Sequence, residues 1–338
     1  MDPAPVDTIA RIITDLNLPS LVVKAEIGTD LEKATEILKN GGLVAIPTET
    51  VYGLAANATN SEAVLKIFEA KNRPSFDPLI VHIGSVEKLA KLVSSFPIQA
   101  RELTKEFWPG PLTIVLPKKK GVPDLVTSGL QTVGIRMPAH PLTQQLLSLL
   151  PFPLAAPSAN PFGYISPTTA QHVAEQLGDK VDYILDGGPS VVGVESTIVS
   201  FEGEVPQILR WGGLELEQIK PFLNTFDISQ QSSDNPSAPG MLSSHYSPRK
   251  RMIIGELDEL IKKHIEKDCS YLSFQKSYNM PGEALSSRGD IREAARNLFA
   301  AMRRLDSTKG NLILAELVPD TGLGQAINDR LKRAAHKS

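Results

Sequence analysis

The sequence predicts a mixed α/β fold divided into two domains. Short apolar runs alternate with segments of helical periodicity along most of the chain, at spacings too irregular for a simple βαβ repeat. The length of 338 residues exceeds that of most single domains, and 41% hydrophobic residues suffice for more than one core. A stretch rich in Ser, Gln, Asn and Pro interrupts the pattern at 224–239 and indicates a linker.

The first domain is expected over residues 23–222, after an N-terminal extension at 1–22. Apolar residues recur at helical spacing in 30–40, with Asp30 as the expected cap and Gly41-Gly42 as the stop. The further elements predicted, in order, are a strand at 43–46, a loop at 48–53 that follows Pro47, a helix at 61–71, a proline-containing loop at 72–78, and strands at 79–83, 112–116, 133–137, 154–157, 181–185 and 196–201.

The second half begins with the linker, assigned to 223–250. Its last part is rich in aromatic and histidine residues, notably His245 and Tyr246, so we expect it to dock onto another surface rather than to act as a spacer. After it, the pattern predicts a small α/β domain over 251–338, with strands at 252–255, 270–274 and 312–317 and helices at 258–266 and 290–305.

Charge and composition exclude several classes of protein. A formal charge of −3 and an isoelectric point of about 6.1 are not those of a dedicated nucleic-acid binder. The single cysteine, Cys269, excludes an internal disulfide framework and a multi-cysteine zinc site, which fits a reducing compartment. Residues 1–20 lack the basic start and apolar run of a signal peptide, and no apolar stretch approaches the ~18 residues that span a bilayer. We therefore expect a cytoplasmic protein without membrane contact.

Two cations lie where the predicted helix at 61–71 turns into a loop. Lys71 and Arg73 are two residues apart at this helix end, so both could face one anion, such as a triphosphate. Basic residues in a last helical turn also complement the helix dipole. The pair alone therefore also admits a purely structural interpretation.

Two loops offer hydroxyl and amide groups. Ser158 and Asn160 follow the strand at 154–157, at the kind of strand end where α/β sheets bind ligands, and both can contact phosphate or a metal-bound oxygen. An ordinary Asx or Ser turn is the alternative interpretation of this segment. The segment 187–197 combines glycines with two hydroxyls, which fits either a carboxylate pocket or a hairpin turn.

Two polar residues lie within apolar strands. His82 fits either a histidine satisfied inside the core or a ligand contact. Arg136 needs an acidic partner or an anionic ligand, because a buried and unpaired guanidinium is costly. An ion pair with Glu49 or Glu195 is the structural alternative, so neither residue decides the function by itself.

Common nucleotide-binding and hydrolase motifs are missing from the sequence, which contains no G-x-x-x-x-G-K-[ST], G-x-G-x-x-G, G-x-S-x-G or H-E-x-x-H. Six histidines and one cysteine, widely separated, offer no protein-built transition-metal site. If a metal takes part, we expect magnesium that arrives with a nucleotide.

Six motifs together resemble those of the YrdC-like threonylcarbamoyl-AMP synthases. Their order and spacing match the family across residues 30–215, and the segment 239–246 followed by a small domain is similar to its long two-domain form. The resemblance therefore covers nearly the whole chain. The motifs are Gly41-Gly42 with PTETVYGL at 47–54, KNRP at 71–74 with PLIVH at 78–82, WPGPLT at 108–113, RMP at 136–138, APSAN at 156–160 and EST at 195–197.

The resemblance implies a fold and an activity. The fold is a twisted mixed sheet around a concave, basic cavity, with a small Rossmann-like α/β domain at the C-terminal end. The activity is that of a nucleotidyltransferase that forms threonylcarbamoyl-AMP and pyrophosphate from ATP, L-threonine and bicarbonate or CO2, with Mg2+ accompanying the ATP. This reaction begins the threonylcarbamoyl-adenosine modification of tRNA, so the resemblance also implies a downstream tRNA threonylcarbamoyl-transferase and a weak tRNA contact.

The resemblance further implies which residues form the site. Tyr246, from the linker, would close over the nucleotide as a lid and exclude water. The chain departs from the family pattern at Asp77, where an amide is common, and at Trp211, where a Pro-Gly pair usually follows the arginine. The implied catalytic residues are Lys71, Arg73, Ser158 and Asn160; the ATP-binding residues are Lys71, Arg73, Asp77, Thr127, Ser158, Ser166, Arg210 and Tyr246; the threonine-binding residues are Thr48, Thr50, His82, Arg136, Ala156 and Ser196.

Two other functions fit parts of the same pattern. A non-catalytic RNA-binding module of the same fold is one, because a concave basic surface can hold RNA as well as ATP. The low isoelectric point and the joint presence of Lys71, Arg73, Ser158 and Asn160 favour catalysis instead. A carbamoyltransferase accessory domain that handles carbamoyl-adenylate is the other, and the sequence lacks the acylphosphatase-like and zinc-finger segments expected of such an enzyme.

Overall fold

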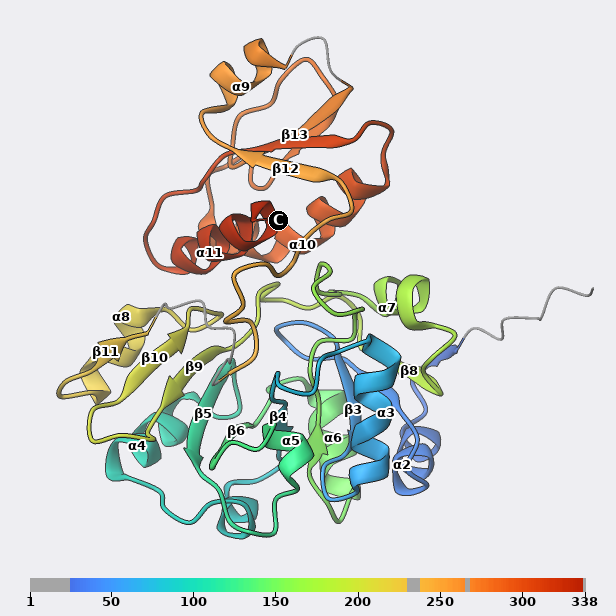
Figure 1. The fold of residues 1–338 in the computed structure, drawn as a ribbon, viewed down its shortest axis with the longest axis vertical. Helices are drawn as coiled ribbons and strands as arrows, with labels where there is room; N and C mark the ends of the chain where they lie inside the picture. Colours follow the sequence, from blue (N-terminus) through green and yellow to red (C-terminus); the bar gives the residue numbers. More distant parts are fainter. Residues whose placement is uncertain (1–24, 230–237, 265–267, 337–338) are drawn as a thin grey trace, which may run out of the picture.

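The computed structural model describes residues 25–229, 238–264 and 268–336. The N-terminal extension expected at 1–22, the linker residues 230–237 and the end of the helix expected at 258–266 lie outside the described residues. The described chain forms a larger α/β body, blue to yellow in Figure 1, and a smaller one, orange to red, that sits above it.

A mixed eleven-stranded sheet organises the larger body, in the order β1-β8-β2-β3-β7-β4-β6-β5-β9-β10-β11. Both parallel and antiparallel neighbours occur in it, which explains the irregular spacing of the apolar runs in the sequence. The strands are β1 (Glu26–Gly28), β2 (Val44–Ile46), β3 (Gly53–Asn57), β4 (Ile80–His82), β5 (Leu112–Pro117), β6 (Thr132–Arg136), β7 (Leu154–Ala155), β8 (Tyr183–Leu185), β9 (Thr197–Ser200), β10 (Gln207–Arg210) and β11 (Asp227–Ile228).

The register of the central strands places polar side chains side by side. Strand β4 pairs with β6 in parallel, with His82 beside Arg136, and β5 pairs with β6 in antiparallel, with Thr113 beside Arg136. Register partners in a sheet project to the same face, so the three side chains form a row. Each of them occurs in a mostly apolar and mostly buried strand, which is why the row lies inside the molecule.

Helices cover this sheet, and local signals in the sequence set their ends. The Asp30 side chain caps the first described helix by accepting a hydrogen bond from the Lys33 N–H at 3.0 Å. Asn72 ends α3 in the left-handed conformation, with φ of 51°, and turns the chain toward Arg73. The helices are α2 (Leu31–Lys39), α3 (Ser61–Lys71), α4 (Ile98–Phe107), α5 (Asp124–Thr127), α6 (Pro141–Leu149), α7 (Ala170–Leu177) and α8 (Leu216–Ile219), with 3₁₀ turns at Val86–Lys91 and Lys220–Phe222.

The smaller body is a parallel four-stranded sheet in the order β12-β15-β13-β14. Helices α10 and α11 lie between this sheet and the larger body in Figure 1, whereas α9 lies on the far side. The elements are β12 (Arg251–Ile254), α9 (Leu257–Lys263), β13 (Cys269–Ser273), β14 (Gly282–Ala284), α10 (Ile291–Ser307), β15 (Leu312–Ala315) and α11 (Leu323–Ala335).

One apolar cluster runs through both bodies. It joins core residues of the large sheet, such as Leu54 and Ile114, to Leu298 and Phe299 of α10 and to Leu331 of α11, all of them fully buried. The smaller body is therefore attached by packing as well as by the linker. None of the helices described is both long enough and apolar enough to cross a bilayer.

The predicted helices at 30–40, 61–71 and 290–305 and every predicted strand are confirmed within two or three residues at each end. Strand β3 was not predicted, because it is rich in glycine and alanine and lacks the β-branched residues typical of strands. The other elements that were not predicted are β1, β10, β14, α4, α5, α6, α7, α8 and α11. The β11 residues lie inside the segment assigned to the linker and pair with β10.

Candidate active site

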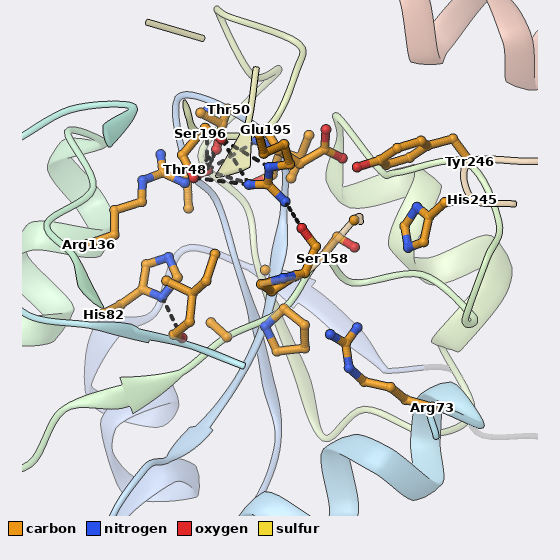
Figure 2. A pocket seen from close by; sticks show the side chains of 18 residues that line it. Thr48, Thr50, Arg73, His82, Arg136, Ser158, Glu195, Ser196, His245 and Tyr246 are labelled. Carbon is orange, nitrogen blue, oxygen red and sulfur yellow. Dashed lines mark hydrogen bonds between the residues drawn. The ribbon is translucent and has the colours of Figure 1, made fainter. Parts of the chain in front are cut away.

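A pocket opens where several central strands of the large sheet end, and the linker forms one of its walls. Figure 2 shows His82 and Arg136 on one side, Arg73, His245 and Tyr246 on the other, and Ser158 between them. The empty space in and around its opening, including open solvent, is about 540 Å³. The lining residues are Thr48, Thr50, Val51, Gly53, Arg73, Ile80, His82, Arg136, Ala156, Pro157, Ser158, Glu195, Ser196, Arg210, Pro239, Gly240, His245 and Tyr246.

Arg136 is 4% exposed and every one of its guanidinium nitrogens is engaged. Its Nη2 donates to Glu49 Oε1 at 2.6 Å, its Nη1 to Thr50 Oγ1 at 2.8 Å, and its Nε to the Gly110 carbonyl at 3.2 Å. Glu49 also accepts from the Ala139 N–H at 3.0 Å. The ion pair with Glu49, one of the alternatives raised by the sequence, is thus present, and Arg136 still faces the pocket.

His82 stands beside Arg136 as a neutral ring. Burial, with a further contribution from the neighbouring Arg136 charge, lowers the pKa of His82 to about 3. Its Nδ1 lies 3.2 Å from the Ile80 carbonyl, which can only accept. In that hydrogen bond Nδ1 carries the proton, so Nε2 keeps a lone pair for a donor.

Hydroxyl groups cluster at the same end of the pocket. In the loop between β2 and β3, the Thr48 hydroxyl donates to the Val51 carbonyl at 2.6 Å and lies 2.8 Å from the Thr50 hydroxyl. Nearby, Ser196 Oγ, just before β9, lies 2.7 Å from Thr113 Oγ1 of β5. These contacts fix the hydroxyl positions before any ligand enters.

Lys71 and Arg73 take different places at the end of α3. Lys71 is 1% exposed and does not line the pocket; its ammonium donates to the carbonyls of Ser158 and Asn160, at 2.6 and 2.5 Å. Burial, and then the nearby Arg73, lower the pKa of Lys71 well below its usual value. Lys71 thereby fixes the backbone of the Ser158 loop, while the Arg73 guanidinium faces the pocket (Figure 2).

Asp77 holds Arg73 in place. Arg73 Nε donates to the Asp77 carbonyl at 3.0 Å and Nη2 to the Pro78 carbonyl at 2.8 Å. Nη2 also lies 2.9 Å from Asp77 Oδ2, in an ion pair whose angles are not those of a hydrogen bond. Burial raises the pKa of Asp77 and the Arg73 charge opposes that rise. The family commonly has an amide at position 77; the Asp77 carboxylate found here faces the Arg73 cation.

Arg210 and Tyr246 bring the linker to the pocket. Arg210 Nε and Nη2 donate to the Ser196 carbonyl at 3.1 and 2.9 Å, and Nη1 donates to the Pro239 carbonyl of the linker at 2.9 Å. Tyr246 is 1% exposed, and burial is the main cause that raises the pKa of its hydroxyl to about 12. Its neutral ring therefore closes one side of the pocket.

The structure brings most of the expected site residues to one cavity. Lys71 and Asn160 lie behind the Ser158 loop, Asp77 behind Arg73, and Ser166 behind Glu195, whose Oε1 accepts from Ser166 Oγ at 2.6 Å. Thr127 lines a smaller cavity nearby, together with Ala238 and Pro239 of the linker. The expected residues that line the main pocket are Thr48, Thr50, Arg73, His82, Arg136, Ala156, Ser158, Ser196, Arg210 and Tyr246.

Sequence reasoning did not place Glu195, His245 or Gly240 at the pocket. Glu195 was considered only as an ion-pair partner of Arg136, although it begins one of the six motifs and precedes an expected site residue. Gly240 has a positive φ of 82°, and a Cβ there would lie 2.6 Å from the Tyr246 hydroxyl. The positive φ and the lack of space for a Cβ explain why a glycine follows Pro239 in the linker.

Two family models match the chain. A model described as "Telomere recombination" matches residues 36–212, and a model described as "Threonylcarbamoyl-AMP synthase, C-terminal domain" matches residues 214–336. The chain is also similar to threonylcarbamoyl-AMP synthases from Pyrococcus abyssi, with 44% identity over 89% of this chain and 93% of the relative, and from Bacillus subtilis, with 41% identity over 90% and 92%.

Solved structures give the same result. The structure of Pyrococcus abyssi Sua5 complexed with L-threonine matches with a TM-score of 0.87 and 44% identity, over 90% of this chain and 94% of that one. The expected fold, a large twisted mixed sheet with a small second α/β domain, is thereby confirmed. The fold, the arginine-lined pocket and these relatives define a nucleotidyl-transferring enzyme. The chain belongs to the threonylcarbamoyl-AMP synthase family, in its two-domain form.

The Glu49→Gln variant tests how strongly the Arg136 network holds the structure. Because the substitution leaves a buried guanidinium without its counter-charge, we expect the free energy of unfolding to fall by about 3 kcal/mol. Denaturant unfolding measures this change. The matched control is Glu26→Gln, which breaks an exposed pair with Lys33 and should cause no measurable loss. Equal stability of both variants would contradict a structural role for the buried pair.

The low pKa of His82 predicts a pH dependence of stability. The unfolded state takes up a proton at His82 below about pH 6.5, whereas the folded state does so only near pH 3, so this contribution is complete above pH 6.5 and is lost between those values as the pH falls. We expect His82→Gln to flatten the dependence of unfolding free energy on pH in that window. Above pH 7 the variant and the wild type should show parallel curves. An unchanged slope below pH 6.5 would show that His82 is charged in the folded state.

Proposed function

We propose that this chain catalyses the formation of threonylcarbamoyl-AMP and pyrophosphate from L-threonine, bicarbonate or CO2, and ATP. The observation that carries the proposal is a single pocket with a guanidinium on each of two opposite sides, Arg136 and Arg73, and Ser158 between them (Figure 2). Such a pocket suits a reaction that joins two anions, an amino-acid carbamate and a nucleoside triphosphate.

The threonine is assigned to the side of Arg136. Its carboxylate would accept from the Arg136 guanidinium, which Glu49 and Thr50 already hold in a fixed orientation. The lone pair of His82 and the hydroxyls of Thr48 and Ser196 can meet the ammonium and hydroxyl groups. A relative of 44% identity crystallised with L-threonine supports this part of the proposal.

The nucleotide is assigned to the side of Arg73. Arg73 and Arg210 supply positive charge for the phosphates, and Ser158 supplies a hydroxyl at the end of β7. Arg210 Nη1 donates one N–H to the Pro239 carbonyl, and its second N–H is available to a phosphate oxygen. The small cavity beside Thr127 then offers an apolar surface for the base.

The chemistry needs positioning more than a nucleophile from the protein. The threonine amine attacks CO2 to give a carbamate with loss of a proton, or attacks bicarbonate to give the carbamate with loss of water. A carbamate oxygen then attacks the α-phosphorus, and the bond to pyrophosphate breaks. The guanidiniums of Arg73 and Arg210 would stabilise charge on the departing pyrophosphate, and the buried linker wall would exclude water from the labile carbamate.

Magnesium belongs to the proposal as a companion of ATP. The described residues hold no group of three or more His, Cys, Asp or Glu side chains that could bind a metal. Asp77 is paired with Arg73, and Glu195 is hydrogen-bonded, so the side-chain donors left in the pocket are neutral groups, namely hydroxyls and histidine rings. This donor set fits an ion held mainly by the phosphates, where it would neutralise their charge.

The cellular setting follows from the proposed reaction. The product is a labile mixed anhydride, so an enzyme that transfers the threonylcarbamoyl group to tRNA must use it downstream. ATP, threonine and tRNA meet in the cytoplasm, which is where we place the protein. The Arg-lined pocket is narrow and partly closed by the linker, so any tRNA contact would be weak and outside it.

The direct test is pyrophosphate release with ATP, threonine, bicarbonate and magnesium, each omitted in turn. We expect release only with the complete mixture. Two variants then separate the sides of the pocket: Arg136→Gln should raise KM for threonine by about tenfold or more, and Arg73→Gln should do the same for ATP. Release without threonine would overturn the proposed function, and equal effects of both variants on both substrates would overturn the assignment of the two sides.

A further inference from the structure

One arginine of the smaller domain contacts the wall of the active-site pocket. Arg330, on α11, is 0% exposed although it carries a full charge. Its Nε donates to Glu195 Oε2 at 3.1 Å and its Nη1 donates to the Trp211 carbonyl at 2.7 Å. Both partners belong to the larger domain, and Glu195 lines the pocket. Arg330 itself does not line it, so it acts on the pocket through other residues.

The Glu195 carboxylate connects Arg330 to a segment on the expected nucleotide side of the pocket. One of its carboxylate oxygens accepts from Arg330 and the other accepts from Ser166 Oγ at 2.6 Å. Ser166 lies in the segment that follows Ser158 and Asn160. A single carboxylate therefore connects the smaller domain with two segments around the pocket, and its orientation is fixed from both ends.

The segment before Glu195 is pressed against the same domain. Gly193 has a positive φ of 83°, and a Cβ at this position would lie 2.4 Å from the Ala295 carbonyl of α10. The backbone thus touches α10 two residues before the side chain of Glu195 meets α11. Two helices of the smaller domain determine the position of this segment.

Tyr246 is held by the same two helices. The guanidinium of Arg330 lies 5.3 Å from the Tyr246 ring centroid, and the Phe299 ring of α10 stacks on that ring at 5.5 Å. Arg333, one turn after Arg330, donates to the Leu242 carbonyl of the linker. The linker wall of the pocket therefore rests on α10 and α11.

Stability alone gives no reason for a charge at this position. Burial lowers the pKa of Arg330, but Tyr246, Glu195 and Asp329 outweigh that effect and raise it, so the guanidinium stays charged. A buried ion pair is often no more stabilising than apolar residues of equal volume, because both charges must leave water. A guanidinium, unlike an apolar side chain, fixes the orientation of its neighbours. It directs donors toward Glu195 and the Trp211 carbonyl and presents a flat face to Tyr246.

We propose that Arg330 is a positioning residue of the active site, through which the C-terminal domain orients Glu195, Ser166 and Tyr246 on the nucleotide side of the pocket. This inference rests on the proposed function for its kinetic readout. The threonine side has its own support in the pair of Arg136 with Glu49, so the loss of Arg330 should affect the two substrates unequally.

The experiment compares the wild type with Arg330→Gln and Arg330→Lys. For both variants we expect kcat to fall by about 10- to 100-fold, since small misplacements of reacting groups have effects of that order. ATP affinity, measured by titration calorimetry, should weaken by roughly tenfold, whereas KM for threonine should stay within about twofold. Lysine keeps the charge but cannot reach Glu195 and the Trp211 carbonyl together, so it should not restore kcat.

Two further variants isolate the pathway. Arg292→Gln is the matched control, because Arg292 also bridges the two domains, to Glu215 at 3.3 Å, but is exposed and does not line the pocket. This variant should retain wild-type kinetics. In the double variant Glu195→Gln with Arg330→Gln, kcat should fall less than the product of the two single effects, because both substitutions break one connection.

Each result decides the inference. Circular dichroism and thermal unfolding establish the folded fraction of every variant. Wild-type kcat and ATP affinity in the folded Arg330 variants would overturn the inference, as would equal losses for both substrates or the failure of both variants to fold. If the wild type releases no threonine-dependent pyrophosphate, the proposed function fails instead, and the calorimetric comparison of ATP binding still tests the position of Arg330.

Discussion

The buried guanidinium of Arg136 is the constraint on which the rest of the site depends. A charge at 4% exposure needs acceptors, and here they come from two segments: the loop that contains Glu49 and Thr50, and the turn at Gly110 before β5. The loop between β2 and β3 must therefore lie against the ends of β5 and β6. That requirement creates the hydroxyl-lined end of the pocket before any ligand is present.

A second buried arginine–carboxylate pair lies beside the pocket, and this one joins the two domains. Glu195 and Arg330 form this second buried pair, in which a carboxylate that lines the pocket is held by an arginine of the smaller domain. The Ser158 loop, which also lines the pocket, has its backbone fixed by the Lys71 ammonium. Charged groups that are expected to serve chemistry thus also serve to hold loops in register, which is why several of them carry perturbed pKa values.

Local patterns in the sequence predicted most of the strands and the helices α2, α3, α9 and α10, because caps, glycine stops and apolar periodicity act within one segment. They also predicted that Arg136 needs a partner, and named Glu49 as one candidate. They could not predict that Lys71 would face the Ser158 backbone, because that contact joins residues 87 positions apart. The position of Arg330 was inaccessible for the same reason: its partner Glu195 is 135 positions away, and only the docking of the two domains brings them together.

The apolar cluster that crosses the domain boundary has a consequence for the evolution of this chain. The surface of the larger domain beneath α10 and α11 includes apolar residues of the shared cluster, whose exposure to water would have a cost in solubility. A gene that lost the second domain would need simultaneous polar substitutions across that surface. The two-domain architecture is therefore easy to keep and hard to abandon, whatever the smaller domain contributes to turnover.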